Sequence, residues 1–404
     1  MTCAAGYTGN MSANCIGTNP RDAGYRCTYC KGVVKRYGRT RDNIRARRQS
    51  VADMMDVKRS YEVQRAWSDR AQIIVQNLFI EMLNRRSSRP PMVALVMCGS
   101  IQRKEACPYS DVDCFALVGK PDDVEVVKLA ATDVQNQLEV VGTYWEGEGG
   151  RLHDGFHFCH GGLSPQHMCA TPEGMIDFID RESDANGHLL DALGGTFVYG
   201  RRSLFDDFAT RAKAYREESG SKSARQKALD SLKKYLDPEN KDKPYRARED
   251  ADFTHIKDRL YRPAQQVIKC VAQYHGITDV ETRTQVHKLK AMGKLSTQVF
   301  GFLDDYLDAV ARLRIANHLK WGREYEIVYF KKPAKPSAEE AELIERGTFP
   351  VAAGAELRQV KQLMADSETI RALGTEFHRQ MSKTGLLASK TNPLLTANPR
   401  AFAA

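Results

Sequence analysis

The chain has 404 residues, of which 42% are hydrophobic and 27% are charged, a composition typical of a soluble globular protein. Its longest apolar runs, such as residues 93–97, are far too short to cross a bilayer, so we expect no membrane-embedded part and no membrane partner. The net charge of +9 favours encounter with nucleotides or polyanions without establishing nucleic-acid binding. The N-terminus has no basic stretch followed by an apolar one, so we expect a cytoplasmic protein, with export by a signal-independent route left open.

Residues 1–50 predict an irregular, basic N-terminal extension, because they are rich in Gly, Asn, Thr and Arg and show little periodicity. Residues 31–48 hold a run of Lys and Arg that is opposed only by Asp42. This run fits either a solvated helix face or contacts with a nucleic-acid backbone. Four early cysteines do not follow the spacing of two tight pairs, so both a structural zinc site and unligated thiols stay open. These cysteines are Cys3, Cys15, Cys27 and Cys30.

Residues 51–205 predict a small domain of strands and helices. Apolar residues recur at helical spacing from Val51 to Arg86, which indicates one long amphipathic helix or two shorter ones. Pro90 and Pro91 end this stretch, because proline has no N–H to continue a helix. The other expected elements are strands over residues 92–98, 110–118 and 138–145, a helix over residues 124–137, a glycine-rich loop over residues 147–162 and a short extended piece over residues 195–199.

The rest of the chain predicts helices. Residues 206–330 begin with a strongly charged helical stretch and continue with apolar positions at helical spacing, which is typical of a helical bundle. Residues 331–404 predict a linker rich in Pro and Lys, then two further helices and a disordered C-terminal tail.

Two carboxylates two residues apart carry the most specific chemistry. Asp111 and Asp113 lie in an expected strand, and side chains at i and i+2 of a strand point to the same face. Two carboxylates on one face supply hard oxygen ligands suited to Mg²⁺, with Mn²⁺ as a substitute. Two such ions can clamp the attacking and leaving oxygens of a phosphoryl displacement.

A Gly-Ser turn precedes these carboxylates. Gly99 and Ser100 follow an apolar strand and open a short helix, so backbone N–H groups are available to a bound phosphate. Gly99 has no Cβ to keep a triphosphate away, and the Ser100 hydroxyl can bind one of its oxygens. A lone Asp-x-Asp or Gly-Ser is common in structural roles, but both occur here within sixteen residues, together with Arg103 and Glu105.

The pattern G-S-x-x-R-x-E-x-x-x-x-S-D-x-D resembles the signature of the DNA polymerase β-like nucleotidyltransferase superfamily. Its Arg-x-Glu form is similar to the branch that holds the PII-protein uridylyltransferase and stand-alone nucleotidyltransferase-like domains of unknown function. The resemblance implies a mixed sheet, an NTP as donor, and a loop shaped by Arg103 and Glu105. It implies nucleotide contacts for Gly99, Ser100, Arg103 and Ser110. The fold class that we expect is therefore α+β, a small mixed-sheet nucleotidyltransferase domain followed by an all-α helical bundle domain.

A second, looser resemblance lies downstream. Residues 251–276 are similar to the Lys-x-x-x-x-Arg-Pro stretch that opens the helical substrate-binding domain of this branch, which implies phosphate or acceptor contacts for Lys257 and Arg262. His255 stands where family members carry Asp. The superfamily also has a third carboxylate on a later strand, for which Asp191 is the best match and Asp154 a weaker one.

The expected function is transfer of a nucleoside monophosphate from an NTP to a hydroxyl, with release of pyrophosphate. Asp111 and Asp113 would hold Mg²⁺, and Asp191 would accept the proton of the acceptor hydroxyl. The resemblance favours a protein side chain as the acceptor, and a small molecule is left open. The alternatives are an RNA-modifying nucleotidyltransferase that uses residues 31–48, and a catalytically silent relative that binds a nucleotide or a partner.

Overall fold

The computed structural model describes most of the chain between residues 49 and 384. Several predictions fall outside its described part, among them those on Asp111, Asp191 and the basic extension. The chain divides into two compact units, the first formed by Met1–Ser219 with His318–Glu324 and the second by Gly220–Asn317 with Tyr325–Ala404. The described residues are 49–87, 89, 91–110, 112–143, 169–182, 192–218, 224–236, 253–321, 326–333, 336, 338–347 and 349–384.

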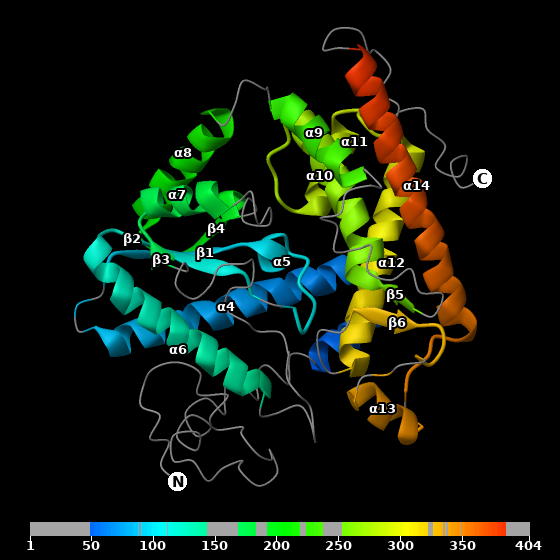
Figure 1. The fold of residues 1–404 in the computed structure, drawn as a ribbon, viewed down its shortest axis with the longest axis horizontal. Helices are drawn as coiled ribbons and strands as arrows, with labels where there is room; N and C mark the ends of the chain where they lie inside the picture. The colour runs from blue at the N-terminus through cyan, green and yellow to red at the C-terminus, as the bar shows by residue number, and fades with distance from the viewer. Residues whose placement is uncertain are drawn as a thin grey trace. The chain divides into compact units, whose positions relative to one another are not determined.

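A four-stranded sheet of order β3-β2-β1-β4 forms the centre of the first unit (Figure 1). The central strand β1 pairs antiparallel with β2 and with β4, whereas β2 pairs parallel with β3, so the small mixed sheet is confirmed. Every residue of β1 and β2 is buried, because helices cover both faces of these strands. The strands are β1 (Val93–Met97), β2 (Cys114–Val118), β3 (Cys169–Ala170) and β4 (Thr196–Gly200).

Helices lie on the two faces of this sheet, α4 and α6 on one and α7 and α8 on the other (Figure 1). Residues 49–55 are helical and α4 begins at Ser60, so the first apolar stretch forms two helices rather than one. A single turn, α5, directly follows β1. The bounds are α4 (Ser60–Arg86), α5 (Gly99–Gln102), η1 (Pro121–Asp123), α6 (Val124–Thr143), α7 (Pro172–Glu182) and α8 (Arg202–Glu218).

The predicted third strand over residues 138–145 is wrong, because α6 continues as a helix through Thr143. Its first turns bury Val127, Ala131 and Val134 completely, and this packing carries the helix into a run of β-branched residues. The strand beside β2 is instead the two-residue β3. The predicted second strand is shorter than expected and begins at Cys114.

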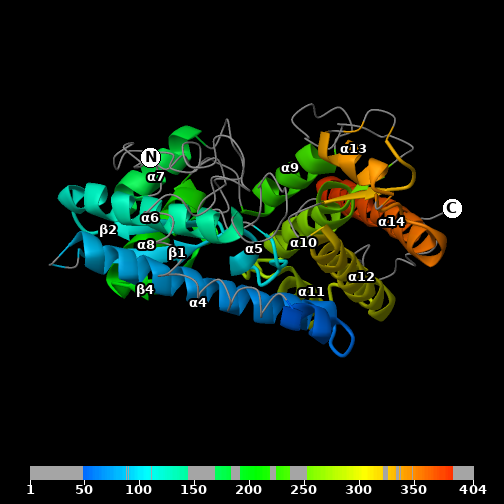
Figure 2. The same cartoon turned by 90° about the horizontal axis from the view of Figure 1, so that it is seen from below.

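The second unit is mostly helical and surrounds one apolar core (Figures 1 and 2). The prediction of an all-α domain needs correction, because β5 and β6 form an antiparallel pair, each too short for strand alternation to appear in the sequence. Helix α14, in the segment predicted to follow the bundle, packs in the same core. The elements are α9 (Ala224–Leu236), β5 (Phe253–His255), η5 (Ile256–Tyr261), α10 (Arg262–Tyr274), α11 (Thr282–Ala291), α12 (Thr297–Trp321), β6 (Ile327–Tyr329), α13 (Ala338–Glu345) and α14 (Gly354–Thr384).

None of the helices within the described ranges combines the length and the apolar character that a bilayer crossing requires.

Candidate functional site

The predicted phosphate turn and one predicted metal ligand lie at one edge of the sheet, where β1 ends and β2 and β4 begin. Met97 of β1 is opposite Cys114 of β2 and Thr196 of β4. Beyond that point the Cys98 N–H donates to the Asp113 carbonyl, at an N–O distance of 2.8 Å. The antiparallel pairing thus brings the Gly-Ser turn against the start of β2.

The carboxylate of Asp113 packs directly on Gly99. A Cβ placed on Gly99 would lie 1.9 Å from Asp113 Oδ2, and the backbone φ of Gly99 is +61°. Both features require glycine, because any side chain would displace the carboxylate and would strain the backbone. Asp113 and Gly99 are therefore in direct contact, and Asp113 precedes the strand instead of lying within it as predicted.

Ser100 carries a hydroxyl suited to a phosphate oxygen. Its Oγ is buried and has no hydrogen-bond partner among the described residues. A buried hydroxyl without a partner costs free energy, which a ligand oxygen would recover. Asp113 adds a hard oxygen ligand of the kind that Mg²⁺ prefers. The described residues contain no cluster of three metal-binding side chains, and Asp111 lies outside them.

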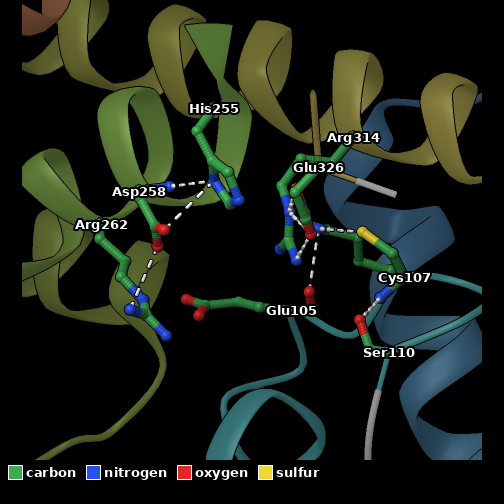
Figure 3. Close-up of polar contacts among 9 residues, drawn as sticks. Glu105, Cys107, Ser110, His255, Asp258, Arg262, Arg314 and Glu326 are labelled. Atoms are coloured by element: carbon green, nitrogen blue, oxygen red, sulfur yellow. Dashed lines mark hydrogen bonds and ion pairs between the residues drawn. The ribbon is translucent and has the colours of Figure 1, made fainter. Parts of the chain in front are cut away.

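Arg103, Glu105 and Ser110 shape the loop between the turn and the aspartates. Arg103 Nε donates to Glu105 Oε2 at 3.0 Å, and Glu105 is only 7% exposed. Ser110 is buried, and its Oγ accepts a hydrogen bond from the Cys107 N–H at 2.9 Å (Figure 3). The structure thus gives Ser110 a loop-closing contact, while its predicted nucleotide contact stays a prediction.

Two residues of α4 that the sequence interpretation missed support this loop. Gln64 Nε2 donates to the Glu105 carbonyl at 3.0 Å, and Ser68 Oγ accepts from the Ala106 N–H at 3.2 Å. Gln64 and Ser68 are buried, as is Ser60, and the three are spaced four residues apart on one face of α4. Polar residues repeated at four-residue spacing on a buried helix face were the signal in the sequence that could have identified these contacts.

Asp191 lies outside the described residues, but the segment that follows it is tied to the turn. Gln102 of α5 donates through Nε2 to the carbonyl of Gly194, just before β4. Ala192 and Leu193 are buried. The chain therefore approaches the same edge of the sheet shortly after Asp191.

In the second unit, Lys257 and Arg262 lie on and just after the π-helical segment η5. His255 caps this segment, since its Nδ1 accepts from the Asp258 N–H at 3.3 Å (Figure 3). Capping is a role that Asp often fills, so His255 supplies the same kind of contact in its place. The Asp258 carboxylate lies 3.1 Å from Arg262 Nη1 and holds that guanidinium in place.

Hydroxyl groups from two long helices bind carbonyls of η5. Tyr306 donates to the Leu260 carbonyl and Ser367 to the Arg259 carbonyl, each at 2.8 Å. Burial raises the pKa of Tyr306, so its phenol stays protonated as a donor. π-Helical segments are rare and occur often at functional sites. The sequence does not reveal this one.

A buried ion pair stands beside η5. Arg314 of α12 is 1% exposed and donates to Glu326 through Nε and Nη2, at 3.0 and 2.5 Å from Oε1 (Figure 3). Its guanidinium carbon lies 4.9 Å from the centre of the Tyr261 ring. Arg314 therefore holds Glu326, the residue before β6, and Tyr261, the last residue of η5, against α12.

Comparison with known proteins found no family model that matches the chain and no curated protein that matches it. The functional argument consequently rests on the residues of the motif and on their geometry.

Proposed function

We propose that the protein is a Mg²⁺-dependent nucleotidyltransferase that moves a nucleoside monophosphate from an NTP to a hydroxyl acceptor and releases pyrophosphate. The observation that carries the proposal is the contact of the Asp113 carboxylate with Gly99, beside the buried Ser100 Oγ, which has no hydrogen-bond partner among the residues that the structure describes. Binding of a metal-bound triphosphate is supported by three features at this edge of the sheet. They are the Asp113 carboxylate, the absence of a Cβ at Gly99 and the buried Ser100 hydroxyl.

Each residue has a stated role in this proposal. Asp111 and Asp113 would hold Mg²⁺, which when bound neutralises charge on the phosphates. Gly99 lets the backbone approach the triphosphate, and the Ser100 hydroxyl donates to one of its oxygens. Asp191 takes the proton of the acceptor hydroxyl as its oxygen bonds to the α-phosphorus and the bond to pyrophosphate breaks. Lys257 and Arg262 stay predicted phosphate or acceptor contacts.

The test measures pyrophosphate release with Mg²⁺ and each of the four common NTPs. We expect Asp113→Asn, and the double change Asp111→Asn/Asp113→Asn, to lower turnover at least about a hundredfold, because neutral amides are poor ligands for Mg²⁺. Asp206→Asn is the control, since Asp206 forms an exposed ion pair with Arg202 on α8. Turnover that survives the double change would reject the proposed site.

The identity of the acceptor needs a separate experiment. Labelled NTPs incubated with the protein and a cell lysate would show which molecule becomes labelled, and we expect a protein. Labelled RNA would favour the alternative that the basic run 31–48 suggests, and its binding would weaken with salt. Nucleotide binding without any turnover would indicate the catalytically silent alternative.

A further inference from the structure

The loop between the Gly-Ser turn and the aspartates is held in an unusual backbone conformation. Lys104 has φ of +60° and is the single non-glycine residue with positive φ in the part of the chain that the structure describes. Such a conformation is sparsely populated for lysine and persists only where the surroundings enforce it. Around it, the Glu105 N–H donates to the Ser100 carbonyl at 2.9 Å, so the loop and the turn are directly connected.

Helix α4 supplies the contacts that enforce this conformation. Lys104 Nζ lies 2.7 Å from Asp69 Oδ1, and Ser68 Oγ binds the Ala106 N–H. Gln64 contributes the most buried of these contacts, since its Nε2 donates to the Glu105 carbonyl at 3.0 Å and lies 3.6 Å from Cys107 Sγ. Three successive loop residues, Lys104, Glu105 and Ala106, are therefore bound by side chains of α4.

Gln64 is placed where it can control the geometry of the turn. It is 4% exposed, and the Glu105 carbonyl to which it donates is buried as well. If Gln64 is replaced by a residue that cannot donate, the Glu105 carbonyl loses a partner that water does not readily replace in such surroundings. The Glu105–Ala106 peptide unit would then shift and move the Glu105 backbone with it, and the N–H of Glu105 is the group that donates to the Ser100 carbonyl.

We propose that Gln64 is a positioning residue for the phosphate-binding turn at Gly99 and Ser100. It acts through the backbone of Glu105, whose carbonyl accepts from Gln64 and whose N–H donates to the Ser100 carbonyl, and so it positions Ser100 relative to the Asp113 carboxylate. The inference rests on the proposed function for its kinetic consequences, while its structural consequence for the loop can be measured without turnover.

The first test compares Gln64→Leu with Gln285→Leu. Gln285 is a matched control, because it is also 4% exposed and donates through Nε2 to a loop carbonyl, that of Asp279 at 2.6 Å, in the other unit. We expect both changes to lower the melting temperature. Only Gln64→Leu should lower kcat, by roughly ten- to a hundredfold, with a smaller change in KM for the NTP, because a small displacement of a bound substrate costs mainly the chemical step.

The second test uses Gln64→Glu. A carboxylate has no proton to donate, whereas a protonated carboxyl can donate to the Glu105 carbonyl as the amide does. The ratio of the kcat of Gln64→Glu to that of the wild type should therefore rise as the pH is lowered from 8 to 6. A role in folding stability alone would not produce this pH-dependent rescue of kcat at a temperature where both proteins are folded.

Hydrogen exchange over residues 99–107 separates this inference from the proposed function. We expect the amides of residues 99–107 to exchange faster in Gln64→Leu than in either the wild type or Gln285→Leu. If the wild type releases no pyrophosphate but Gln64→Leu still loosens these residues, the proposed function fails and the positioning role stands. If exchange in Gln64→Leu equals that of the wild type, or if kcat falls equally in Gln285→Leu, the positioning role is overturned.

Discussion

A Cβ on Gly99 would lie 1.9 Å from Oδ2 of Asp113, less than the contact distance of any two non-bonded heavy atoms. The Gly-Ser turn and Asp113, the predicted phosphate-binding and metal-binding residues, therefore fit together only because residue 99 has no side chain. Since the same glycine has φ of +61°, a larger residue would meet two separate penalties, a collision and a strained backbone.

We expect Gly99→Ala to lower turnover about a hundredfold, because it displaces the Asp113 carboxylate, and to cost about 1–2 kcal/mol of stability through backbone strain. Gly276→Ala is the control. Gly276 has φ of +78°, and no atom of the described residues lies within 4 Å of an added Cβ, so this change introduces the strain without a collision. Pyrophosphate release and urea unfolding would be measured for both. Equal activity of the two variants would argue against a functional contact between Gly99 and Asp113.

Because Arg314 and Glu326 form a buried ion pair, we expect a single substitution to lower the free energy of unfolding far more than a double substitution that removes both charges. Glu326→Gln leaves a guanidinium that is 1% exposed without its counter-charge, so we expect a loss of about 3–5 kcal/mol in the free energy of unfolding. The double change Arg314→Met/Glu326→Leu should recover most of that loss, because it removes both buried charges. Lys288→Gln, which breaks the more exposed pair with Asp279, should cost about 0–1 kcal/mol. Circular dichroism in urea measures all three, and a mild effect of Glu326→Gln would contradict the buried pair.

His275 predicts an acid sensitivity of the second unit. Burial lowers the pKa of His275 from 6.5 to about 4, and the charges of Lys294 and Arg225 add to this effect. Its Nε2 is buried and has no hydrogen-bond partner within the described segments. Because the unfolded chain binds a proton on this residue more readily than the folded one, stability should fall as the pH falls from about 6.5 to about 4.

His275→Leu should weaken that pH dependence, because leucine takes up no proton. Unfolding free energies of the wild type and the variant would be compared at several pH values between 7 and 4. Carboxylates that titrate in the same range contribute to both proteins, so the difference between the two curves isolates His275. Parallel curves would show that His275 is protonated equally in the folded and the unfolded chain.

Removing the hydroxyls of Tyr306 and Ser367, which bind carbonyls of η5, should destabilise this segment. Tyr306→Phe and Ser367→Ala each leave a carbonyl without its side-chain donor, at Leu260 and Arg259 respectively, and should each cost about 1–3 kcal/mol. Thr369→Val is the control on α14, since Thr369 donates only to the carbonyl of Ala365 within the same helix. Urea unfolding gives the costs, and hydrogen exchange over residues 256–262 should rise in the first two variants only. Unchanged exchange would mean that η5 is stable without these donors.

Local patterns determined a large part of the first unit. The apolar run over residues 93–97 predicted the fully buried β1, because a strand covered on both faces needs apolar residues at every position. The sequence also placed the Gly-Ser turn between this strand and the segment that becomes β2, because an apolar run lies on each side of the turn. Helical spacing likewise placed α4 and the helices around the core of the second unit, since each needs one apolar face.

Other features depend on contacts between residues far apart in the chain. The run over residues 138–143 reads as a strand by composition, yet it continues α6. The π-helical η5 is bound by hydroxyls of α12 and α14, and Gln64 meets Glu105 across 41 residues. Hydrophobic periodicity reports which face of one element is buried, and it carries no information about which partner a buried polar group will find. Only the tertiary structure decides that, because hydrogen bonds require particular atoms at short distances, whereas burial requires only apolar surface.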